Sequence, residues 1–319
     1  MSQRLNRRDF VSGSVLGASM AAAAGMPGLA VNAVADETKP LKPIVAKQQV
    51  PQAALVLGFT MGRMILGGNL LTHYTHSRDL RYVYNLAAHY NTPEKIKETL
   101  RIAEAHGANA TVIHTAKGVL DGMRAYKKEG GKLKWIVCPT ARISDDMKDY
   151  AKGCKECADA GVDSLYLWGV HADRMTGKPD LFKKAVDVMK SFNLPVGIAA
   201  HQLSVIEVCE REKVECDYYL KTLHHHNYPS AKLNHDSSWC NDPNKVIEVM
   251  AKVEKPWIAY KIMAAGAIKP KNAMEYAFQN GADFVVCGMF DYEIDEDSRL
   301  ANEVLNQDKV KNRPRKWFG

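Results

Sequence analysis

Eight short apolar runs recur between residues 64 and 291, and this repetition limits the possible folds more than any other feature of the sequence. The runs are "MILGGN" (64–69), "ATVIHT" (110–115), "KWIVCPT" (134–140), "SLYLWG" (164–169), "VGIAAHQ" (196–202), "CDYYLKTLH" (216–224), "WIAYKIMAAG" (257–266) and "FVVCGMFD" (284–291). Continuous apolar runs of this length, bounded by polar segments, are typical of parallel strands that are covered on both faces.

Amphipathic helical patterns fill the intervals between the runs. Examples are "TPEKIKETLRIAEAHG", "DDMKDYAKGCKECADAG", "DPNKVIEVMAKV" and "KPKNAMEYAFQNGAD", of which several open with Thr or Asp before Pro and close with Gly. Eight strand and helix units in one domain predict a (β/α)8 TIM barrel. The alternative is a doubly wound open sheet, which would not need eight near-equal units.

The first 35 residues have the layout of an export signal. Arg7 and Arg8 precede an apolar stretch rich in Ala and Gly, which ends in Ala33-Val34-Ala35. With Asp9 and Phe10 after it, the arginine pair resembles a twin-arginine signal. This resemblance implies export of the folded protein to the periplasm by the twin-arginine machinery. The alternatives are an ordinary secretory signal or a retained membrane anchor.

We divide the chain into a signal peptide (1–35), a linker (36–55), a catalytic barrel (56–310) and a basic C-terminal tail (311–319). Loss of the signal peptide removes three arginines and one aspartate, which lowers the formal net charge from +7 to +5. So small a charge, without a basic stripe, argues against a nucleic-acid partner. No later apolar run is long enough to span a bilayer, so we expect no stable membrane anchor after cleavage.

Seven cysteines, an odd number, are scattered through apolar strands and helices and do not indicate a disulfide framework. Only Cys154 and Cys157 are close in sequence. They lie inside a helical pattern and not at a helix start, which favours two partly buried thiols over a redox or metal site.

Most histidines follow the predicted strands, whose carboxyl ends form the active face of a TIM barrel. The histidines within a few residues of a strand end are His114, His171, His201 and His224. We predict that these four hold a divalent Zn, Mn or Fe ion. The remaining loop histidines, which we expect to be solvated, are His73, His76, His89 and His235.

Two lysines, Lys221 and Lys261, interrupt apolar strands. An ammonium is costly beside apolar helices, so we expect both side chains to point into the upper mouth of the barrel. Two amines in one cavity would lower each other's pKa, and one of them could act as a base or attack a carbonyl. The alternative is that they pair with an interior carboxylate such as Asp291 and only stabilise the barrel.

The segment "NYPSAKLNHDSSWCNDP" is a long βα loop, which predicts a lid or a substrate wall. Aromatic and polar side chains near the mouth suit a sugar or another polyhydroxy carbonyl compound. The predicted substrate-binding residues of this kind are Asn69, Trp168, Tyr228 and Trp239.

The segments "MGRMILGGNLL", "TPEKIKETLRIAEAHGANATVIHTA" and "AGVDSLYLWGVHAD" resemble the opening strands of the aldo/keto reductases. Residues 60–305 as a whole resemble twin-arginine-exported barrel proteins related to that family. The reductase pattern ends the second strand in a catalytic Asp, follows it with a Tyr, ends the third strand in a Lys and places a His on the fourth. Here His114 replaces the Asp, no Tyr follows, Thr140 ends the third strand, and only His171 fits. Carbonyl reduction needs the Tyr and the Lys, so the sequence argues against NADPH.

The last two units, "YKIMAAGAIKPKNAMEYAFQNGADFVVCGMF", are similar to the closing strands of aldolase-type barrels. Together, "YLKT" and "YKIMAAG" resemble the paired lysines of deoxyribose-phosphate aldolase-like enzymes. This similarity implies a Schiff-base lysine, with Gly266 and Gly288 placed to hold a phosphate against backbone amides.

Four functions therefore stay open. The leading hypothesis is metal-assisted lyase, isomerase or hydrolase chemistry on a small sugar-like substrate, with Lys261, Lys221 and Asp291 as catalytic residues. The others are a Schiff-base lyase that uses Lys261 or Lys221, a nicotinamide-dependent reductase, and a periplasmic binding protein without activity.

Overall fold

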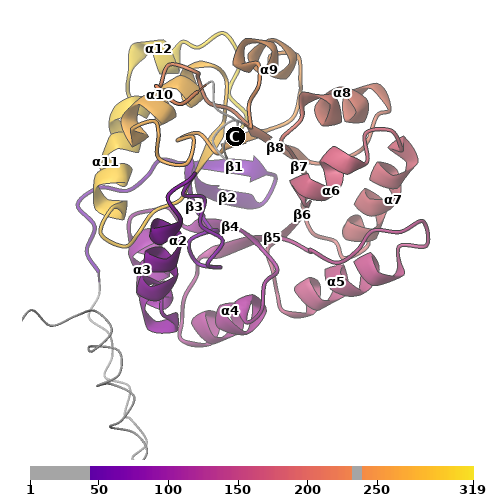
Figure 1. Ribbon diagram of the computed structural model, residues 1–319, viewed down its shortest axis with the longest axis horizontal. Coiled ribbons are helices and arrows are strands. Elements are labelled where there is room, and N and C mark those ends of the chain that lie inside the picture. The colour runs from indigo at the N-terminus through magenta and orange to yellow at the C-terminus, as the bar shows by residue number, and fades with distance from the viewer. Residues whose placement is uncertain (1–43, 232–238) are drawn as a thin grey trace, which may run out of the picture. The chain divides into compact units, whose positions relative to one another are not determined.

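Eight parallel strands close into a barrel in the computed structural model, which describes residues 44–231 and 239–319 (Figure 1). In chain order they are β3 (Met64–Gly67), β4 (Ala110–His114), β5 (Lys134–Cys138), β6 (Ser164–Leu167), β7 (Val196–Ala200), β8 (Tyr218–Thr222), β9 (Trp257–Tyr260) and β10 (Phe284–Cys287). Each strand pairs with its neighbours in sequence, and β10 pairs with β3 to close the barrel. The predicted (β/α)8 TIM barrel is confirmed.

A ring of helices surrounds the barrel (Figure 1). Its members are α3 (Pro93–Ala105), α4 (Val119–Lys128), α5 (Lys148–Asp159), α7 (Pro179–Lys190), α8 (Leu203–Arg211), α9 (Pro243–Met250), α10 (Pro270–Gln279) and α11 (Ile294–Leu305). Shorter additions are α2 (Arg81–Tyr90), α6 (Gly169–Arg174) and α12 (Asp308–Lys311). Helix α3 starts where Thr92 accepts a hydrogen bond from the Lys95 amide, with Pro93 in the first turn.

Alternation along the strands separates two apolar clusters. The inner cluster fills the barrel and includes Ile65, Ile136, Tyr218, Leu220, Ile258 and Phe284. The outer cluster lies under the helices and includes Trp135, Leu165, Tyr219, Leu223 and Trp257. On β8, therefore, Tyr218 and Leu220 point inward, whereas Tyr219 and Lys221 point outward.

A hairpin of β1 (Gln52–Val56) and β2 (Phe59–Gly62) covers the N-terminal end of the barrel. Its Leu55, Phe59 and Met61 join the inner cluster. The amide of Gly62 donates to the Asn109 side chain at 2.9 Å, directly before β4. Residues 44–55, which were expected to be part of a linker, belong to the compact unit Ile44–Gly319.

The last residues of the chain also pack against the N-terminal end of the barrel. Arg313 and Arg315 are buried, and their guanidinium groups reach Asp283 at 2.6 and 2.7 Å. The basic segment 311–319 is therefore part of the folded domain, because Asp283, directly before β10, gives Arg313 and Arg315 a buried partner.

All seven cysteines are free and buried. Burial raises the pKa of both Cys154 and Cys157 to about 12, as expected for inert thiols. No helix within residues 44–231 and 239–319 is long and apolar enough to cross a membrane. The predicted signal peptide (1–35) and His235 lie outside the described residues.

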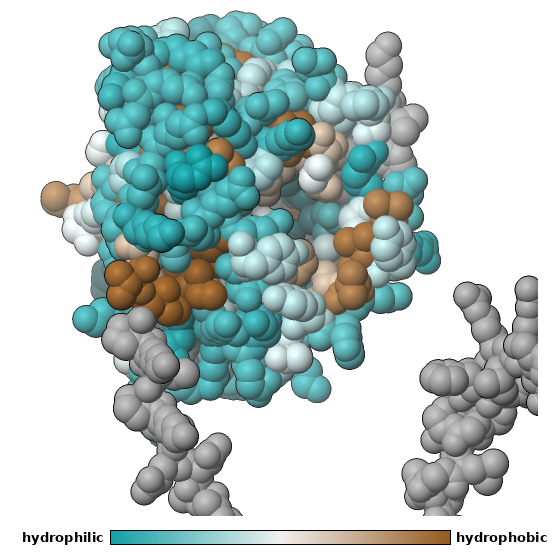
Figure 2. All heavy atoms as spheres, turned by 90° about the vertical axis from the view of Figure 1, so that its left-hand side faces the viewer, coloured by the Kyte–Doolittle hydropathy of each residue, from teal (hydrophilic) through white to brown (hydrophobic). Residues whose placement is uncertain are grey.

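The surface over the side that carries α3 and α11 is mainly hydrophilic, with separate hydrophobic areas (Figure 2). Helix α2 contributes exposed apolar and aromatic side chains, because only Ala87 of this helix is buried. The most exposed large apolar or aromatic side chains of α2 are Tyr82 and Leu86.

Candidate active site

A histidine and a carboxylate meet at the mouth, by which we mean the carboxyl ends of the barrel strands and the loops that follow them. His201 directly follows β7, and Asp173 lies near the end of α6. The His201 Nδ1 atom lies 2.7 Å from Asp173 Oδ2, and the His201 amide donates to Asp173 Oδ1 at 3.1 Å. A carboxylate only accepts hydrogen bonds, so Nδ1 carries the proton and Nε2 of the neutral ring keeps its lone pair.

The surroundings of His201 keep its ring neutral. Burial lowers the pKa of His201, the hydrogen bond to Asp173 opposes this shift, and the charges of Lys261 and Lys221 lower the pKa further. Because its pKa lies below the ordinary 6.5, the ring is an available base at neutral pH.

Tyr260 ends β9 and points into the barrel beside His201, with ring centroids 5.5 Å apart. Its hydroxyl has no hydrogen-bond partner among the described residues, and burial raises its pKa well above the ordinary value. A Cβ atom on Gly169 would lie 3.1 Å from both the Tyr260 oxygen and His201 Cε1. Glycine at position 169 therefore allows the phenol and the imidazole to pack directly against the backbone of α6.

Lys261 directly follows β9, and its side chain extends over the mouth towards His76 and Trp239. Its Nζ atom lies 3.1 Å from His76 Nε2 and 5.1 Å from the centre of the Trp239 ring. Trp239 in turn packs on His201 at 4.6 Å between centroids. Lys261 has φ +57°, which costs about 1–2 kcal/mol for a non-glycine residue. This turn of the backbone directs the side chain over the mouth although β9 has ended.

His114 and His171 also lie at the mouth, but apart from each other. His114 ends β4 facing inward, and its ring packs edge-on against Tyr74 at 5.7 Å. His171 packs against Trp168 at 5.2 Å, and its Nδ1 atom is buried without a partner among the described residues. Burial lowers the pKa of both histidines.

The expectation that Lys221 points into the mouth is wrong. Lys221 has the parity of Tyr219 and leaves β8 on its outer side, where it is 1% exposed. Its Nζ donates to His201 O (2.7 Å), Thr222 O (3.1 Å) and Thr222 Oγ1 (2.6 Å). Burial lowers its pKa to about 8, without a contribution from Lys261. Carbonyl and hydroxyl oxygens at the ends of β7 and β8 compensate the charge of Lys221.

His224 and Tyr228 do not line the mouth either. The rings lie 6.0 Å apart, and both residues are buried on the outer side of β8, where Tyr228 belongs to the outer cluster. Burial lowers the pKa of His224 to about 4. The reason is that β8 ends at Thr222, after which Leu223 packs into the outer cluster.

Asp291 is not a partner of the strand lysines. It accepts hydrogen bonds from the Tyr90 hydroxyl at 2.7 Å and from Lys95 Nζ at 3.1 Å. Burial acts to raise the pKa of Asp291, but the bonds from Tyr90 and Lys95 outweigh it and hold the pKa below its usual value. Asp291 therefore ties the loop after β10 to α2 and α3.

The remaining predicted binding residues have mainly backbone roles. The Asn69 carbonyl accepts from the Tyr74 amide at 2.8 Å and so shapes the loop that carries Tyr74 and His76. Gly266 has φ +85°, but its amide donates to Met263 O at 3.0 Å and is not available to a phosphate. Gly288 lies exposed beside Gly67, where a Cβ would lie 3.1 Å from the Gly288 nitrogen.

The four predicted metal ligands do not share one place. His114 lies beside Tyr74, His171 against Trp168, His201 on Asp173, and His224 behind β8. Within residues 44–231 and 239–319, no three His, Cys, Asp or Glu side chains come together as a possible metal site. The described residues thus supply no ligand set for the predicted ion, and the ion stays a prediction.

Sequence reasoning missed Asp173 and Tyr260 and assigned His76 to solvent. Asp173 stands two residues after His171, and Tyr260 directly precedes Lys261 with the opposite strand parity. Parity alone would have directed attention to Tyr260. Nothing local indicates that Asp173 binds a histidine 28 residues away.

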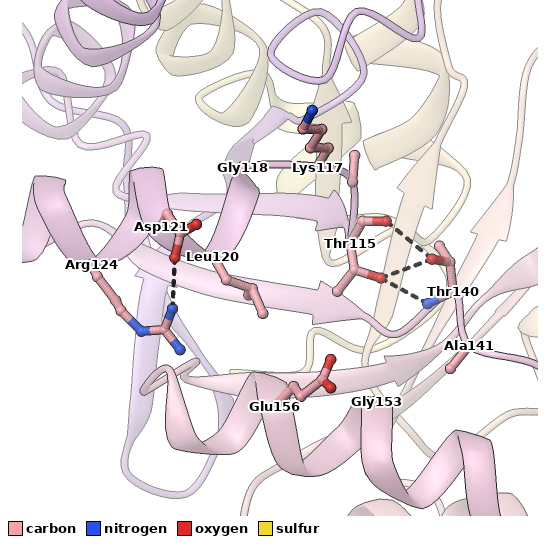
Figure 3. Close-up of a pocket in the computed structure, with 11 residues that line it drawn as sticks. Thr115, Lys117, Gly118, Leu120, Asp121, Arg124, Thr140, Ala141, Gly153 and Glu156 are labelled. Carbon is pink, nitrogen blue, oxygen red and sulfur yellow. Dashed lines mark hydrogen bonds and ion pairs between the residues drawn. The ribbon is translucent and has the colours of Figure 1, made fainter.

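A separate hollow of about 580 Å³ lies outside the barrel between α4 and α5 (Figure 3). Thr115 and Thr140 line one end, and their hydroxyl oxygens lie 2.9 Å apart. Asp121 and Arg124 form an ion pair at 2.9 Å at the other end. Thr140, which stands where the reductase pattern has Lys, therefore belongs to this hollow and not to the group around His201.

Solved structures with the same fold include several aldo-keto reductases. A Pseudomonas aeruginosa protein provisionally named an aldo-keto reductase has a TM-score of 0.57 and 13% identity, over 82% of this chain and 98% of its own. An aldo-keto reductase from Bacillus halodurans, in its holo form, has a TM-score of 0.53 and 8% identity, over 84% and 97%. A mutant of Gox0644 in complex with NADPH has a TM-score of 0.50 and 13% identity, over 83% and 92%.

At these identities the likeness shows the barrel fold and not its chemistry. No family model and no curated protein sequence matches the chain. The function must therefore be argued from the mouth itself.

Proposed function

We propose that the protein is a barrel enzyme in which His201 moves protons to and from a small polyhydroxy or carbonyl compound bound at the mouth. The observation that carries this proposal is the Asp173–His201 pair, in which one carboxylate holds both the ring and the backbone of the histidine. A carboxylate in this position fixes the tautomer and stabilises the imidazolium that forms when the base accepts a proton.

The neighbouring groups suit such a substrate. The Tyr260 hydroxyl, which is buried beside His201 without a partner among the described residues, can donate a hydrogen bond to a substrate oxygen that reaches it from the mouth. Lys261 supplies positive charge for a developing alkoxide or enolate, and Trp239 offers an aromatic wall beside His201. A carbon-bound proton next to a carbonyl is therefore the group that His201 is best placed to remove.

Exchange of carbon-bound protons in D2O tests this role directly. We expect dihydroxyacetone, glyceraldehyde or a pentulose to lose the proton signal next to its carbonyl when the protein is added, as followed by NMR. His201→Ala should lower the rate about 10²- to 10⁴-fold, while the exposed His89→Ala serves as control. The rate should be constant above pH 6.5 and fall at lower pH, because the His201 pKa lies below 6.5. Exchange that survives His201→Ala would refute the proposal.

Metal-assisted chemistry, the leading hypothesis on sequence, is now an alternative in which an ion would need ligands beyond the described groups. Elemental analysis of the exported protein tests it. A stoichiometric ion that is lost in His201→Ala and retained in Lys261→Ala would restore it.

A Schiff-base mechanism now depends on Lys261 alone, because Lys221 is buried with its hydrogens bound to carbonyl and hydroxyl oxygens. Lys261 lies at the mouth within 3.1 Å of a histidine that can shuttle protons. Borohydride with a carbonyl substrate should trap an adduct on Lys261 in that case. No adduct in the wild type would remove this alternative.

One specific observation favours carbonyl reduction as an alternative. The mouth contains a tyrosine and a lysine after all, Tyr260 and Lys261, although at the seventh barrel strand and not where the reductase pattern has them. We keep NADPH out of the proposal because His114 and Thr140 occupy the pattern's Asp and Lys positions. A fluorescence titration that gives micromolar NADPH affinity would reverse this choice.

We further propose export to the periplasm through the twin-arginine machinery, on the evidence of Arg7, Arg8 and the apolar stretch after them. Replacing both arginines by lysine should leave the precursor in the cytoplasm. Unchanged delivery to the periplasm would refute the route but not the barrel chemistry. A folded, exported protein with no exchange, no metal and no adduct would favour the binding-protein alternative.

A further inference from the structure

We propose that Lys221 is a positioning residue that holds His201 and Trp239 in place from behind the barrel wall. The inference rests on the proposed role of His201, since it explains how that side chain is held. Lys221 is buried, so its effect on a substrate passes through the residues that it binds.

The contacts of Lys221 converge on the strand ends that carry the site. Its ammonium donates to the His201 carbonyl at 2.7 Å and to the Thr222 hydroxyl at 2.6 Å. The Thr222 oxygen lies 3.2 Å from the same His201 carbonyl and 3.3 Å from the Trp239 carbonyl. One lysine and one threonine thus join the backbones of the two residues whose rings pack together at 4.6 Å.

The two sides of His201 are therefore bound to different groups. Asp173 holds the ring nitrogen and the amide, whereas Lys221 holds the carbonyl. Three fixed points leave the imidazole little freedom to rotate or to move along β7. A displacement of about 1 Å at a reacting group can lower a rate by about 10²-fold, so this restraint matters for turnover.

Stability alone does not account for a lysine at this position. A buried ammonium loses its hydration, and an apolar side chain of similar length is often as stable or more stable. The charged and titratable groups around the amine are the Cys240 thiol, the Asp173 carboxylate and the rings of His201 and His224. Its charge also favours the neutral form of His201, which the proposed base requires.

The experiment compares two pairs of variants by NMR and by proton exchange. Lys221→Met keeps the length of the side chain and removes its hydrogen bonds, with the exposed Lys183→Met of α7 as matched control. Thr222→Val removes the bridging hydroxyl, and Thr222→Ser restores it. The first readout is the signal of the His201 Nδ1–H proton in its bond to Asp173, which requires no substrate. The second is exchange of the dihydroxyacetone protons in D2O.

We expect Lys221→Met and Thr222→Val to shift or broaden the His201 signal and to lower the exchange rate about 10- to 100-fold. KM should change less than kcat, and Thr222→Ser and Lys183→Met should behave like the wild type. An unchanged His201 signal in a folded Lys221→Met variant would overturn the proposal. If Lys221→Met does not fold, an unchanged signal in Thr222→Val overturns it equally.

The two readouts separate this inference from the proposed function. If exchange persists in His201→Ala, the proposed function fails, while the His201 signal in the Lys221 and Thr222 variants still decides whether these residues position the ring. If His201→Ala abolishes exchange and the signal does not move, the function stands and the positioning role fails.

Discussion

At the N-terminal end of the barrel Asp283 binds both Arg313 and Arg315, whereas at the mouth the Tyr260 hydroxyl has no partner among the described residues. Asp283 also accepts the amides of Trp257 and Phe318, each at 2.9 Å. The two arginines also donate to backbone carbonyls at the ends of α9 and α10 and in the turns that follow these helices. Asp283, Arg313 and Arg315 thus all have fixed partners.

Backbone strain is more concentrated at the mouth, although Asn193 and Lys213, in the loops before β7 and β8, also have positive φ. The hairpin at the N-terminal end turns at Gly58, with φ +81°, where glycine adopts the left-handed conformation without strain. The loop after β9 places Lys261, Ala264 and Ala265 in that conformation, at about 1–2 kcal/mol per residue. Groups that are satisfied add stability, and the strained loop after β9 and the unpartnered Tyr260 hydroxyl are consistent with the site that we propose at the mouth.

The largest expected effect is at the N-terminal end. Asp283→Ala leaves two buried arginines without their carboxylate and should lower the free energy of unfolding by about 3–5 kcal/mol. Urea unfolding measures it. The control is Glu254→Ala, whose exposed pair with Lys316 at 3.8 Å should contribute less than about 1 kcal/mol. A loss below about 1 kcal/mol in Asp283→Ala would contradict the role of this end as the stabilising one.

The second largest effect is the loss of stability in acid that His224, buried behind β8, should cause. Its folded pKa of about 4 lies below the ordinary 6.5, so the unfolded chain binds the proton more readily and stability falls as the pH drops from 6.5 to 4. His224→Phe should remove a loss of roughly 3 kcal/mol at pH 4 and change little at pH 7.5. Unfolding curves at the two pH values measure it, and equal acid sensitivity in both proteins would show that other groups dominate.

At the mouth, Tyr260→Phe should separate stability from function. Removing a buried hydroxyl that has no partner should leave the free energy of unfolding unchanged or raise it by up to about 1 kcal/mol. Proton exchange should fall about 10-fold, since a hydrogen bond to the substrate is lost. A destabilised variant with full activity would mean that the phenol is structural, which would break the comparison between the two ends.

The smallest effect on stability is expected for Gly169→Ala. The new Cβ would lie 3.1 Å from the Tyr260 oxygen and from His201 Cε1, so both groups must shift by a few tenths of an ångström. We expect a change within about 1 kcal/mol in unfolding but a clear loss of exchange, because the methyl group displaces the phenol and the imidazole from their positions. Undiminished exchange would show that the proposed reaction does not depend on the placement of these two groups.

The sequence by itself determined the barrel, because strand and helix periodicities are local and eight of them leave few other architectures. The run predicted at 134–140 appears as β5 (Lys134–Cys138), and the other seven barrel strands lie within their predicted runs. It also indicated that His114, His201, Lys261 and Trp239 belong near the mouth, since the carboxyl ends of parallel strands share one face.

Only the tertiary structure decided which side chains meet. Whether Lys221 faces the cavity depends on the parity of β8, and the outward course of the chain at His224 depends on where that strand ends. Asp173 binds His201 across 28 residues, and Asp291 binds Lys95 across 196, so neither partnership has a local signature. The sequence shows that a charged residue lies in an apolar run and that its burial would be unfavourable. Which carbonyl or carboxylate stabilises that charge depends on how distant segments pack against each other.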